Sequence, residues 1–364
     1  MKIGFILPRF FASVPFGGYR VVYELANGLA AKGHEVDIFF PAGGLVGRGL
    51  FDGLLSWWRK WLAYLSPVNE RELKVKWMVL DERVRSLLFA TLDSDRWRSL
   101  DAIVATAWQT AELLAEEGGQ LRARKLYLIQ GYETMMGPKG RVDATWRLPF
   151  RKVVVSEWLK NLALKFGDQQ PVKATPVIDF NLFRILRPVE ERDRLTIGMM
   201  YHLPRFKGGK DALKALEIVR RQYPGIKVKC ISVHPLRPLV PRWVECHINP
   251  PQERLAELYN ECAVFISSSW VEGFGLPGAE ALACGCALAT TDSLGVREYA
   301  IDGETALLSP PRDPERLAEN VIRLMNDELR MRLARQGNQF IQCFTRQRTA
   351  DIFEEAIYST FSGP

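Results

Sequence analysis

The sequence predicts an α/β protein made of two Rossmann-like halves. Three observations lead to this expectation. Short apolar runs, typical of buried strands, alternate with segments of helical spacing. The alternation occurs twice, over residues 1–178 and again over residues 179–346, and a stretch with three prolines, 168–188, stands between the two series. The 364 residues, 47% of them apolar, suffice for two domains with separate cores.

The expected elements follow in order. The first half begins with a strand, Lys2–Leu7, and a helix, Tyr19–Lys32, and Gly33 stands where a helix C-cap belongs. The other strands expected in this half are 35–40, 102–105, 125–129 and 152–155. The second half is expected to contain strands at 196–200, 227–233, 264–267 and 287–290, and helices at 211–222, 253–260 and 276–283.

Composition and charge exclude several classes of protein. The six cysteines form no CxxC pair, so neither a disulfide framework nor a zinc ligand set is expected. No apolar run is long enough for a membrane-spanning helix, and the N-terminus lacks a signal peptide, so a cytoplasmic protein is expected. The net charge is +7, and residues 1–180 hold 25 basic against 19 acidic side chains. This imbalance fits an anionic partner or a plain solvated surface.

One segment interrupts the α/β alternation. Residues 51–66 read FDGLLSWWRKWLAYLS, with three tryptophans around Arg59 and Lys60. Aromatic and basic residues on a short amphipathic helix are typical of a peripheral contact with a membrane, here the inner face of the plasma membrane. A core helix or an acceptor-side lid with its tryptophans packed inward fits the same pattern. Both interpretations stay open.

The strongest motif lies at residues 269–286. A strand ends there in a loop with Gly273 and Gly275, and a helix follows with Pro277 in its first turn. Glycines let backbone amides approach a ligand closely, and a helix N-terminus favours a phosphate or another anion. Glu280 in the helix and Glu272 in the loop can bracket one bound molecule. Two carboxylates in such a turn make simple helix capping a poor explanation.

The segment from Glu272 to Glu280, EGFGLPGAE, resembles the donor-site signature of retaining GT-B glycosyltransferases of family 4. The resemblance extends to weaker matches along the chain, at Gly17-Gly18, 28–39, 153–167, 175–183 and 308–327. It implies GT-B architecture, in which two Rossmann-like domains face each other across a cleft. Residues 1–178 would form the acceptor-side domain and 179–346 the nucleotide-sugar domain, with a last helix, 347–361, packing back on the first.

The resemblance also implies an activity, the transfer of a sugar from a nucleoside-diphosphate sugar to an acceptor hydroxyl with retention of configuration. Glu272 would contact the donor sugar and Glu280 the ribose hydroxyls. The sugar and phosphates would be held by backbone groups of Gly273, Phe274, Gly275 and Leu276. A loop containing Gly17 and Gly18 would close against the donor pyrophosphate. A glycan or lipid-linked acceptor in surface polysaccharide or glycolipid synthesis is the expected partner.

The basic segment 204–209, PRFKGG, supplies the second donor element. Lys207 matches the Lys-Gly position of the resembling family, and a fixed cation stabilises the negative charge that grows on a departing diphosphate. The partner arginine of that family usually follows a glycine at the end of the strand, where this chain has Met199 after Gly198. Arg205 is the candidate to replace it. His202 nearby could touch a phosphate or cap the turn.

The acceptor side departs from the resembling family. Many members have a histidine there, whereas this chain reads Leu128 to Glu133 without one. Gln130, Tyr132 and Glu133 are therefore the candidates for acceptor contacts. The loop 248–251 is expected to lie near the nucleobase, but none of its residues indicates which base is recognised.

No cofactor and no metal are expected. The triplet Asp93-Ser94-Asp95 has the DxD pattern of metal-dependent glycosyltransferases but does not end a clear strand. The chain has neither the G-x-G-x-x-G of dehydrogenases nor a P-loop, and no nucleic-acid motif. Two alternatives remain, a sugar-nucleotide epimerase of the same fold and a catalytically silent module that binds membranes or anions.

Overall fold

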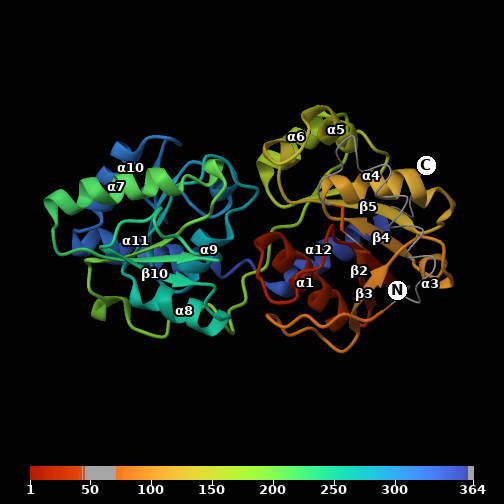
Figure 1. Cartoon of the computed structure of the whole chain (residues 1–364), viewed down its shortest axis with the longest axis horizontal. Helices are drawn as coiled ribbons and strands as arrows, with labels where there is room; N and C mark the ends of the chain where they lie inside the picture. The colour runs from red at the N-terminus through yellow and green to blue at the C-terminus, as the bar shows by residue number, and fades with distance from the viewer. Residues whose placement is uncertain (43, 46–70, 360–364) are drawn as a thin grey trace. The chain divides into compact units, whose positions relative to one another are not determined.

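The computed structural model describes residues 1–42, 44–45 and 71–359, so the tryptophan-rich segment 51–66 lies outside the described residues. The chain forms two compact units (Figure 1). The first contains residues up to Val177 and the C-terminal segment from Arg346 onward, and the second runs from Ile178 to Thr345. Among the described helices, none is both long and apolar enough to cross a membrane.

The first unit is built on a seven-stranded parallel sheet with the order β3-β2-β1-β4-β5-β6-β7. Its strands are β1 (Lys2–Ile6), β2 (Glu35–Pro41), β3 (Val84–Phe89), β4 (Ala102–Ala105), β5 (Arg124–Ile129), β6 (Arg151–Val154) and β7 (Val172–Lys173). Its helices are α1 (Gly17–Ala31), α3 (Asp95–Arg98), α4 (Trp108–Glu117), α5 (Lys139–Trp146), α6 (Glu157–Lys165) and α12 (Arg346–Tyr358). Short 3-10 turns lie at η1 (Gly118–Gln120) and η2 (Glu133–Met135). The central strands are almost wholly apolar and buried, as parallel strands covered on both faces must be.

The second unit is built on a six-stranded parallel sheet with the order β10-β9-β8-β11-β12-β13. Its strands are β8 (Thr196–Met200), β9 (Lys227–Ser232), β10 (Val244–Ile248), β11 (Val264–Ser267), β12 (Ala287–Thr291) and β13 (Leu307–Ser309). Its helices are α7 (Gly209–Gln222), α8 (Gln252–Glu261), α9 (Leu276–Ala283), α10 (Pro314–Arg323) and α11 (Asp327–Ile341), with 3-10 turns η3 (Val189–Glu191), η4 (Arg205–Lys207) and η5 (Gly295–Glu298). Within this unit α7 and α10 cover one face of the sheet, and α8 and α9 cover the other (Figure 1).

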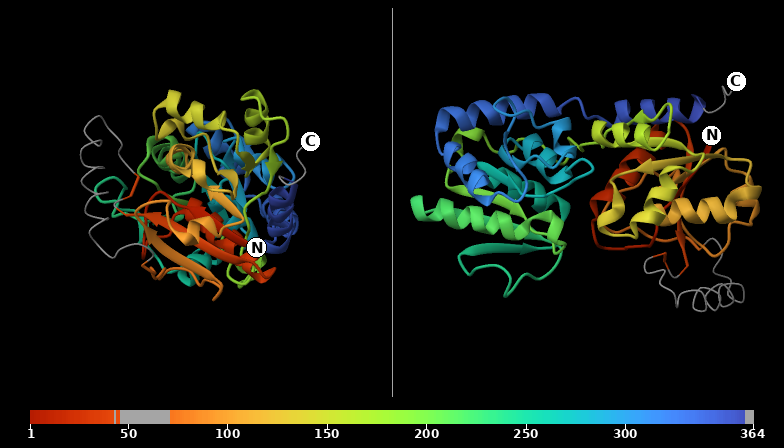
Figure 2. Two further views of the ribbon diagram at one scale, coloured as in Figure 1. Left: turned by 90° about the vertical axis from the view of Figure 1, so that its right-hand side faces the viewer. Right: turned by 90° about the horizontal axis from the view of Figure 1, so that it is seen from above.

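The last helix belongs to the first unit, where α12 packs beside α1 and contacts β6 and β7. Figure 2 shows this blue helix next to the red N-terminal elements. A buried carboxylate, Glu24 of α1, accepts two hydrogen bonds from Arg346, at 2.7 and 3.0 Å. The small Gly28 allows close contact, because a Cβ there would lie 3.0 Å from the Cβ of Ala350.

The structure confirms the expected strands to within one residue at either end, and Gly33 has the left-handed backbone of a helix C-cap, with φ 89°. One expectation was wrong. Gly17 and Gly18 are not in a loop but form the first turn of α1, because the carbonyl of Phe16 accepts the amides of Tyr19 and Arg20. The proline-containing stretch 168–188 does contain the boundary between the two units, after Val177, and its residues Val172–Lys173 also form β7 beside β6.

Candidate active site

The second unit has a reversal of strand order between β8 and β11. From β8 the chain proceeds outward to β9 and β10, and then returns to β11 on the other side of β8. Helices that start at the carboxyl ends of these two strands lie on opposite faces of the sheet, and such a reversal is where open α/β sheets bind ligands. Segment 204–208 follows β8 and segment 268–275 follows β11. The two donor motifs predicted from the sequence therefore meet at this edge.

A glycine lets these two loops pack closely. Gly208 has a left-handed backbone, with φ 65°, and a Cβ there would lie 1.9 Å from the carbonyl oxygen of Ser268. The Ser268 hydroxyl donates to the Gly208 carbonyl at 2.8 Å, and the Trp270 amide donates to the carbonyl of Phe206 at 2.8 Å. Any side chain at position 208 would push the loops apart, so the conformational freedom of glycine is required here.

Lys207 and Glu272 face each other across this contact. The Lys207 Nζ lies 2.8 and 2.9 Å from the two carboxylate oxygens of Glu272, and the Ser269 hydroxyl donates to Glu272 Oε1 at 2.7 Å. Burial favours a raised pKa for Glu272, but the Lys207 charge and these hydrogen bonds outweigh it, and the pKa is lowered. The site thus holds a charged pair that a ligand with both phosphate and hydroxyl groups can separate.

His202 also belongs to this group, two residues beyond the end of β8. Burial, and after it the charge of Lys207, lower the pKa of its imidazole to about 4, although the charge of Glu272 acts in the opposite direction. The imidazole is therefore neutral at pH 7. The sequence left its role open between a phosphate contact and a cap, and the structure places it within electrostatic reach of Lys207 and Glu272.

The second carboxylate lies in α9. Gly275, with φ 94°, is the N-cap of this helix, and Pro277 occupies its first turn as expected. Glu280 is 5% exposed and accepts a hydrogen bond from the Tyr259 hydroxyl at 3.1 Å. Glu280 is thus a buried carboxylate in the second turn of α9.

Tyr299 is a site residue that the sequence did not reveal. Its buried hydroxyl donates to the Gly275 carbonyl at 2.6 Å and thereby holds the turn that begins α9. Burial raises its pKa well above the ordinary value, and the charges of Glu272 and Glu280 raise it further. Both carboxylates therefore lie near one phenol, which brings the two ends of the EGFGLPGAE motif together. No sequence pattern singled out this tyrosine, because 23 residues of chain separate it from Leu276 at the start of α9.

The expected nucleobase segment follows the edge strand β10. Asn249 has a left-handed backbone, with φ 45°, and its amide donates to the carbonyl of Ser232 at 2.7 Å. This contact ties the loop after β10 to the end of β9. Pro251 then serves as the N-cap of α8. The loop is thus fixed at both ends beside the carboxyl edge of the sheet.

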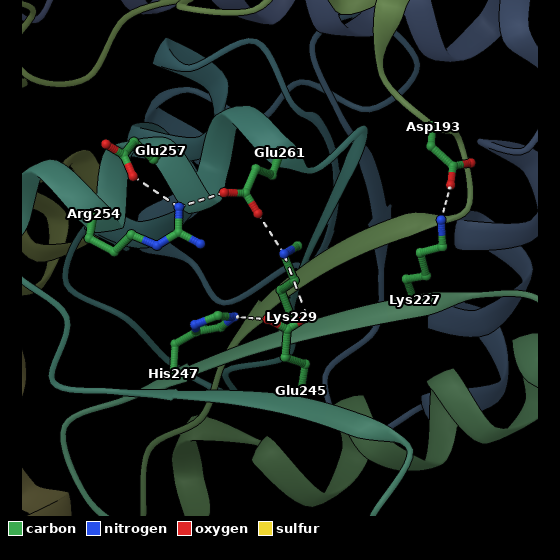
Figure 3. A network of polar contacts seen from close by, with 8 residues as sticks. All are labelled: Asp193, Lys227, Lys229, Glu245, His247, Arg254, Glu257 and Glu261. Atoms are coloured by element: carbon green, nitrogen blue, oxygen red, sulfur yellow. Dashed lines mark hydrogen bonds and ion pairs between the residues drawn. The ribbon is translucent and has the colours of Figure 1, made fainter.

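A polar network fastens α8 to the same two strands (Figure 3). Lys229 of β9 lies 2.5 Å from Glu261 of α8 and 3.5 Å from Glu245 of β10. Arg254, in the first turn of α8, lies 2.5 Å from Glu261, and His247 of β10 lies 2.9 Å from Glu245. Glu261 at the end of α8 is thereby joined to Lys229 of β9, and Arg254 links the first turn of the helix to the same carboxylate.

The acceptor-side candidates lie at the carboxyl edge of the first sheet. Gln130 follows β5, and its amide approaches the first turn of α1, because a Cβ on Gly18 would lie 3.3 Å from the Gln130 Oε1. Tyr132 donates its hydroxyl to Asp143 at 2.5 Å and packs edge-on against Trp146, with ring centroids 5.7 Å apart. The structure therefore brings Gly18 and Gln130 together. Their acceptor roles stay predictions.

Glu133 binds the start of α4. Its Oε2 accepts a hydrogen bond from the Trp108 amide at 2.8 Å, and the Tyr127 hydroxyl lies 3.5 Å away. Burial raises the pKa of Glu133 to about 7, although both hydrogen bonds lower it. Glu133 therefore titrates near neutral pH in the folded protein, whereas a carboxyl in an unfolded chain titrates near 4.5.

This difference predicts a pH-dependent stability. The folded state holds the Glu133 proton more tightly, so the resulting stabilisation is fully present below about pH 4.5 and is lost as the pH rises through about 7. Relative to a Glu133→Gln variant, the wild type should lose on the order of 1–3 kcal/mol of unfolding free energy across this range. Urea unfolding of both proteins near pH 5 and pH 8 measures it. A pH-independent difference between the two would refute the assignment.

The remaining predicted residues lie elsewhere. The Arg205 guanidinium lies over the indole ring of Trp270, with its Cζ 5.5 Å from the ring centroid, and its contact with a diphosphate stays a prediction. Arg98 pairs with both carboxylates of the DxD triplet, Asp93 and Asp95. In the part of the chain that the structure describes, no three His, Cys, Asp or Glu side chains are grouped so that they could hold a metal ion.

Comparison with known families and sequences finds similar proteins. Residues 243–340 match the family described as glycosyl transferases group 1. An uncharacterized glycosyltransferase of Methanocaldococcus jannaschii, MJ1178, is 31% identical over 97 residues, which are 26% of this chain and 28% of that protein. The capsular polysaccharide biosynthesis glycosyltransferase CapM of Staphylococcus aureus is 30% identical over 118 residues, 32% of this chain and 30% of CapM. The chain thus spans under a third of the length of these curated relatives.

Solved structures resemble the whole chain. Sucrose-phosphate synthase of Thermosynechococcus elongatus gives a TM-score of 0.74 at 16% identity, with 99% of both chains covered. HepE of Anabaena, in complex with UDP and glucose, gives 0.70 at 14% identity, with 99% of this chain and 100% of HepE covered. At such identities the likeness concerns the fold. The protein therefore has the GT-B architecture, and its residues 243–340 carry the segment characteristic of glycosyl transferases group 1.

Proposed function

We propose that the protein is a retaining glycosyltransferase that moves a sugar from a nucleoside-diphosphate sugar to an acceptor hydroxyl, in the synthesis of a surface polysaccharide or glycolipid. The observation that carries the proposal is the placement of Lys207, Glu272 and Glu280 around the start of α9, at the strand-order reversal of the second sheet. The match of residues 243–340 to glycosyl transferases group 1 supports it, as do the names of CapM and of the UDP complex of HepE.

The charged pair suggests how the donor is accommodated. The diphosphate takes over the Lys207 ammonium, and the N-terminus of α9 adds backbone donors and the positive end of its dipole. Glu272, released from Lys207, accepts hydrogen bonds from sugar hydroxyls. Glu280 accepts from the ribose hydroxyls. The ion pair between Lys207 and Glu272 is thereby exchanged for one contact of each side chain with the donor.

The chemistry follows from these contacts. The bond between the anomeric carbon and the phosphate oxygen breaks, and its electron pair goes to the diphosphate, where Lys207 stabilises the growing charge. The acceptor oxygen forms the new bond to the anomeric carbon on the same face, and its proton passes to the departing phosphate. This route needs neither a covalent enzyme intermediate nor a metal ion. Gln130, Tyr132 and Glu133 of the first unit are proposed as acceptor contacts.

Donor cleavage tests this function. The protein is incubated with UDP-, GDP- and dTDP-sugars in chelator, without an acceptor, so that water takes the acceptor's place. We expect slow release of free sugar and nucleoside diphosphate from one donor class, with proton NMR showing the original anomeric configuration first. An epimerised sugar would instead identify an epimerase, and no turnover of any donor would count against the proposal.

A further inference from the structure

Three loops of the second unit bring two arginines and a tryptophan together. Arg205 follows β8, Trp270 follows β11 and Arg312 follows β13, so all three lie at the carboxyl edge of the second sheet. The Cζ of Arg205 lies 5.5 Å from the centroid of the Trp270 ring, and the Cζ of Arg312 lies 4.1 Å from it. Both distances are in the range of cation–π contacts.

The tryptophan ring is held firmly. Its indole Nε1 donates to the Asp211 carboxylate at 2.7 Å, and its backbone amide donates to the Phe206 carbonyl at 2.8 Å. Arg312 follows Pro310 and Pro311 and has a left-handed backbone, with φ 65°. Such a backbone is unfavourable for a side chain larger than glycine, and it persists where the surroundings impose it. The strained turn carries the Arg312 side chain to the ring.

The two guanidinium groups have no acidic partners. Within residues 1–42, 44–45 and 71–359, no carboxylate forms an ion pair with Arg205 or Arg312, and both side chains are exposed. The nearby carboxylates are engaged otherwise, since Asp211 accepts from the indole and Asp313 caps α10 by accepting from the Arg316 amide. Other exposed arginines at this edge are paired, Arg297 with Asp292 and Arg316 with Glu319. The guanidinium groups of Arg205 and Arg312 therefore stand beside Trp270 without an ion pair to these carboxylates.

We propose that Arg205, Trp270 and Arg312 form a second anion-binding site, which binds a phosphate group of the acceptor substrate. The inference rests on the proposed function. A guanidinium group can donate two parallel hydrogen bonds to the oxygens of one phosphate. Stacking on an indole ring orients the guanidinium plane, and a guanidinium is more weakly hydrated than an ammonium group. Arg205 is two residues from Lys207, and Trp270 is two residues from Glu272. The proposed anion site thus adjoins the donor site, and it gives Arg205 this role in place of the diphosphate contact expected from the sequence.

Phosphate can come from a soluble phosphorylated sugar or from a lipid headgroup, and two assays distinguish these sources. The protein is first saturated with whichever of UDP, GDP or dTDP it binds. Equilibrium dialysis then measures its affinity for glycerol 3-phosphate, and co-sedimentation measures its binding to vesicles of phosphatidylglycerol against vesicles of phosphatidylcholine. We expect Arg312→Gln to weaken binding in at least one assay by about tenfold or more, in line with the loss of charge-assisted hydrogen bonds.

The matched control is Arg316→Gln. This substitution removes the same charge four residues further along the chain, where Arg316 is already paired with Glu319. It should leave anion binding unchanged, and both variants should retain wild-type affinity for the nucleotide. Equal losses in the two variants would mean a general charge effect, and wild-type protein that binds neither probe would lack the site. Either result overturns this inference. If the protein binds none of the three nucleotides, that result counts against the proposed function and not against this inference. The binding of glycerol 3-phosphate and of the vesicles is then measured without nucleotide.

Discussion

Replacing Lys207 by methionine is expected to slow donor cleavage by a factor of about 10²–10³, the usual cost of removing one group that stabilises the charge of a transition state. The negative charge on the diphosphate grows as the glycosidic bond breaks, so the ammonium contributes more to the transition state than to the bound donor. The affinity for nucleoside diphosphate should fall less than the rate. Initial rates of donor hydrolysis and calorimetric titrations of the same preparations measure both quantities.

Two further variants make this result specific. Lys210→Met removes the same charge from an exposed position in α7 and should leave the rate unchanged. Methionine at position 207 also leaves the partly buried Glu272 without its ion pair, which costs stability. The double variant with Glu272→Gln removes that cost, so its thermal stability separates a folding defect from a catalytic one. A well-folded Lys207→Met protein with wild-type kcat would exclude Lys207 from the diphosphate.

Glu280→Ala is expected to weaken nucleotide binding by about 2–3 kcal/mol, or about 30–150-fold, the scale of hydrogen bonds to a charged group. The carboxylate is 5% exposed, and the hydroxyl of Tyr259 occupies one oxygen. The carboxylate is proposed to accept hydrogen bonds from the ribose hydroxyls as well. Calorimetric titration with the preferred nucleoside diphosphate measures the loss.

The control for this prediction is Tyr259→Phe, which removes the hydroxyl on Glu280 but keeps the charge and the ring. It should lower affinity by much less than Glu280→Ala, because the carboxylate remains to bind the ligand. Unchanged affinity in Glu280→Ala would show that this carboxylate only caps and packs α9.

Much of the fold could be predicted because the parallel strands are continuous apolar runs. The strand Val264–Ser267 and the helix Leu276–Ala283 were expected with the bounds that the structure has. Four of the described strands, β3, β7, β10 and β13, were not expected, and the two residues of β7 carry no alternation and pair only with β6. Gly17 and Gly18 were expected in a loop because they match the glycine loop of the resembling family, yet the hydrogen bonds to Phe16 start α1 there.

The site could be predicted where its residues lie in one stretch of sequence. Glu272, Gly275, Pro277 and Glu280 form a local motif, and Lys207 stands beside a glycine in another. The contacts between distant segments could not be foreseen. Tyr299 reaches Gly275 from η5, and Arg312 reaches Trp270 from the loop after β13. Such contacts depend on the order of the strands in the sheet, because that order decides which distant loops become neighbours. Local sequence patterns do not give this order.

The most direct test of the donor site is calorimetric titration of the wild-type protein with UDP, GDP and dTDP in the presence of chelator. The account predicts that one of the three binds with a micromolar Kd and a stoichiometry of one, because Lys207, Glu280 and the start of α9 together provide for a diphosphate and a ribose. Failure of all three to bind would contradict a nucleoside-diphosphate-sugar site in the second unit.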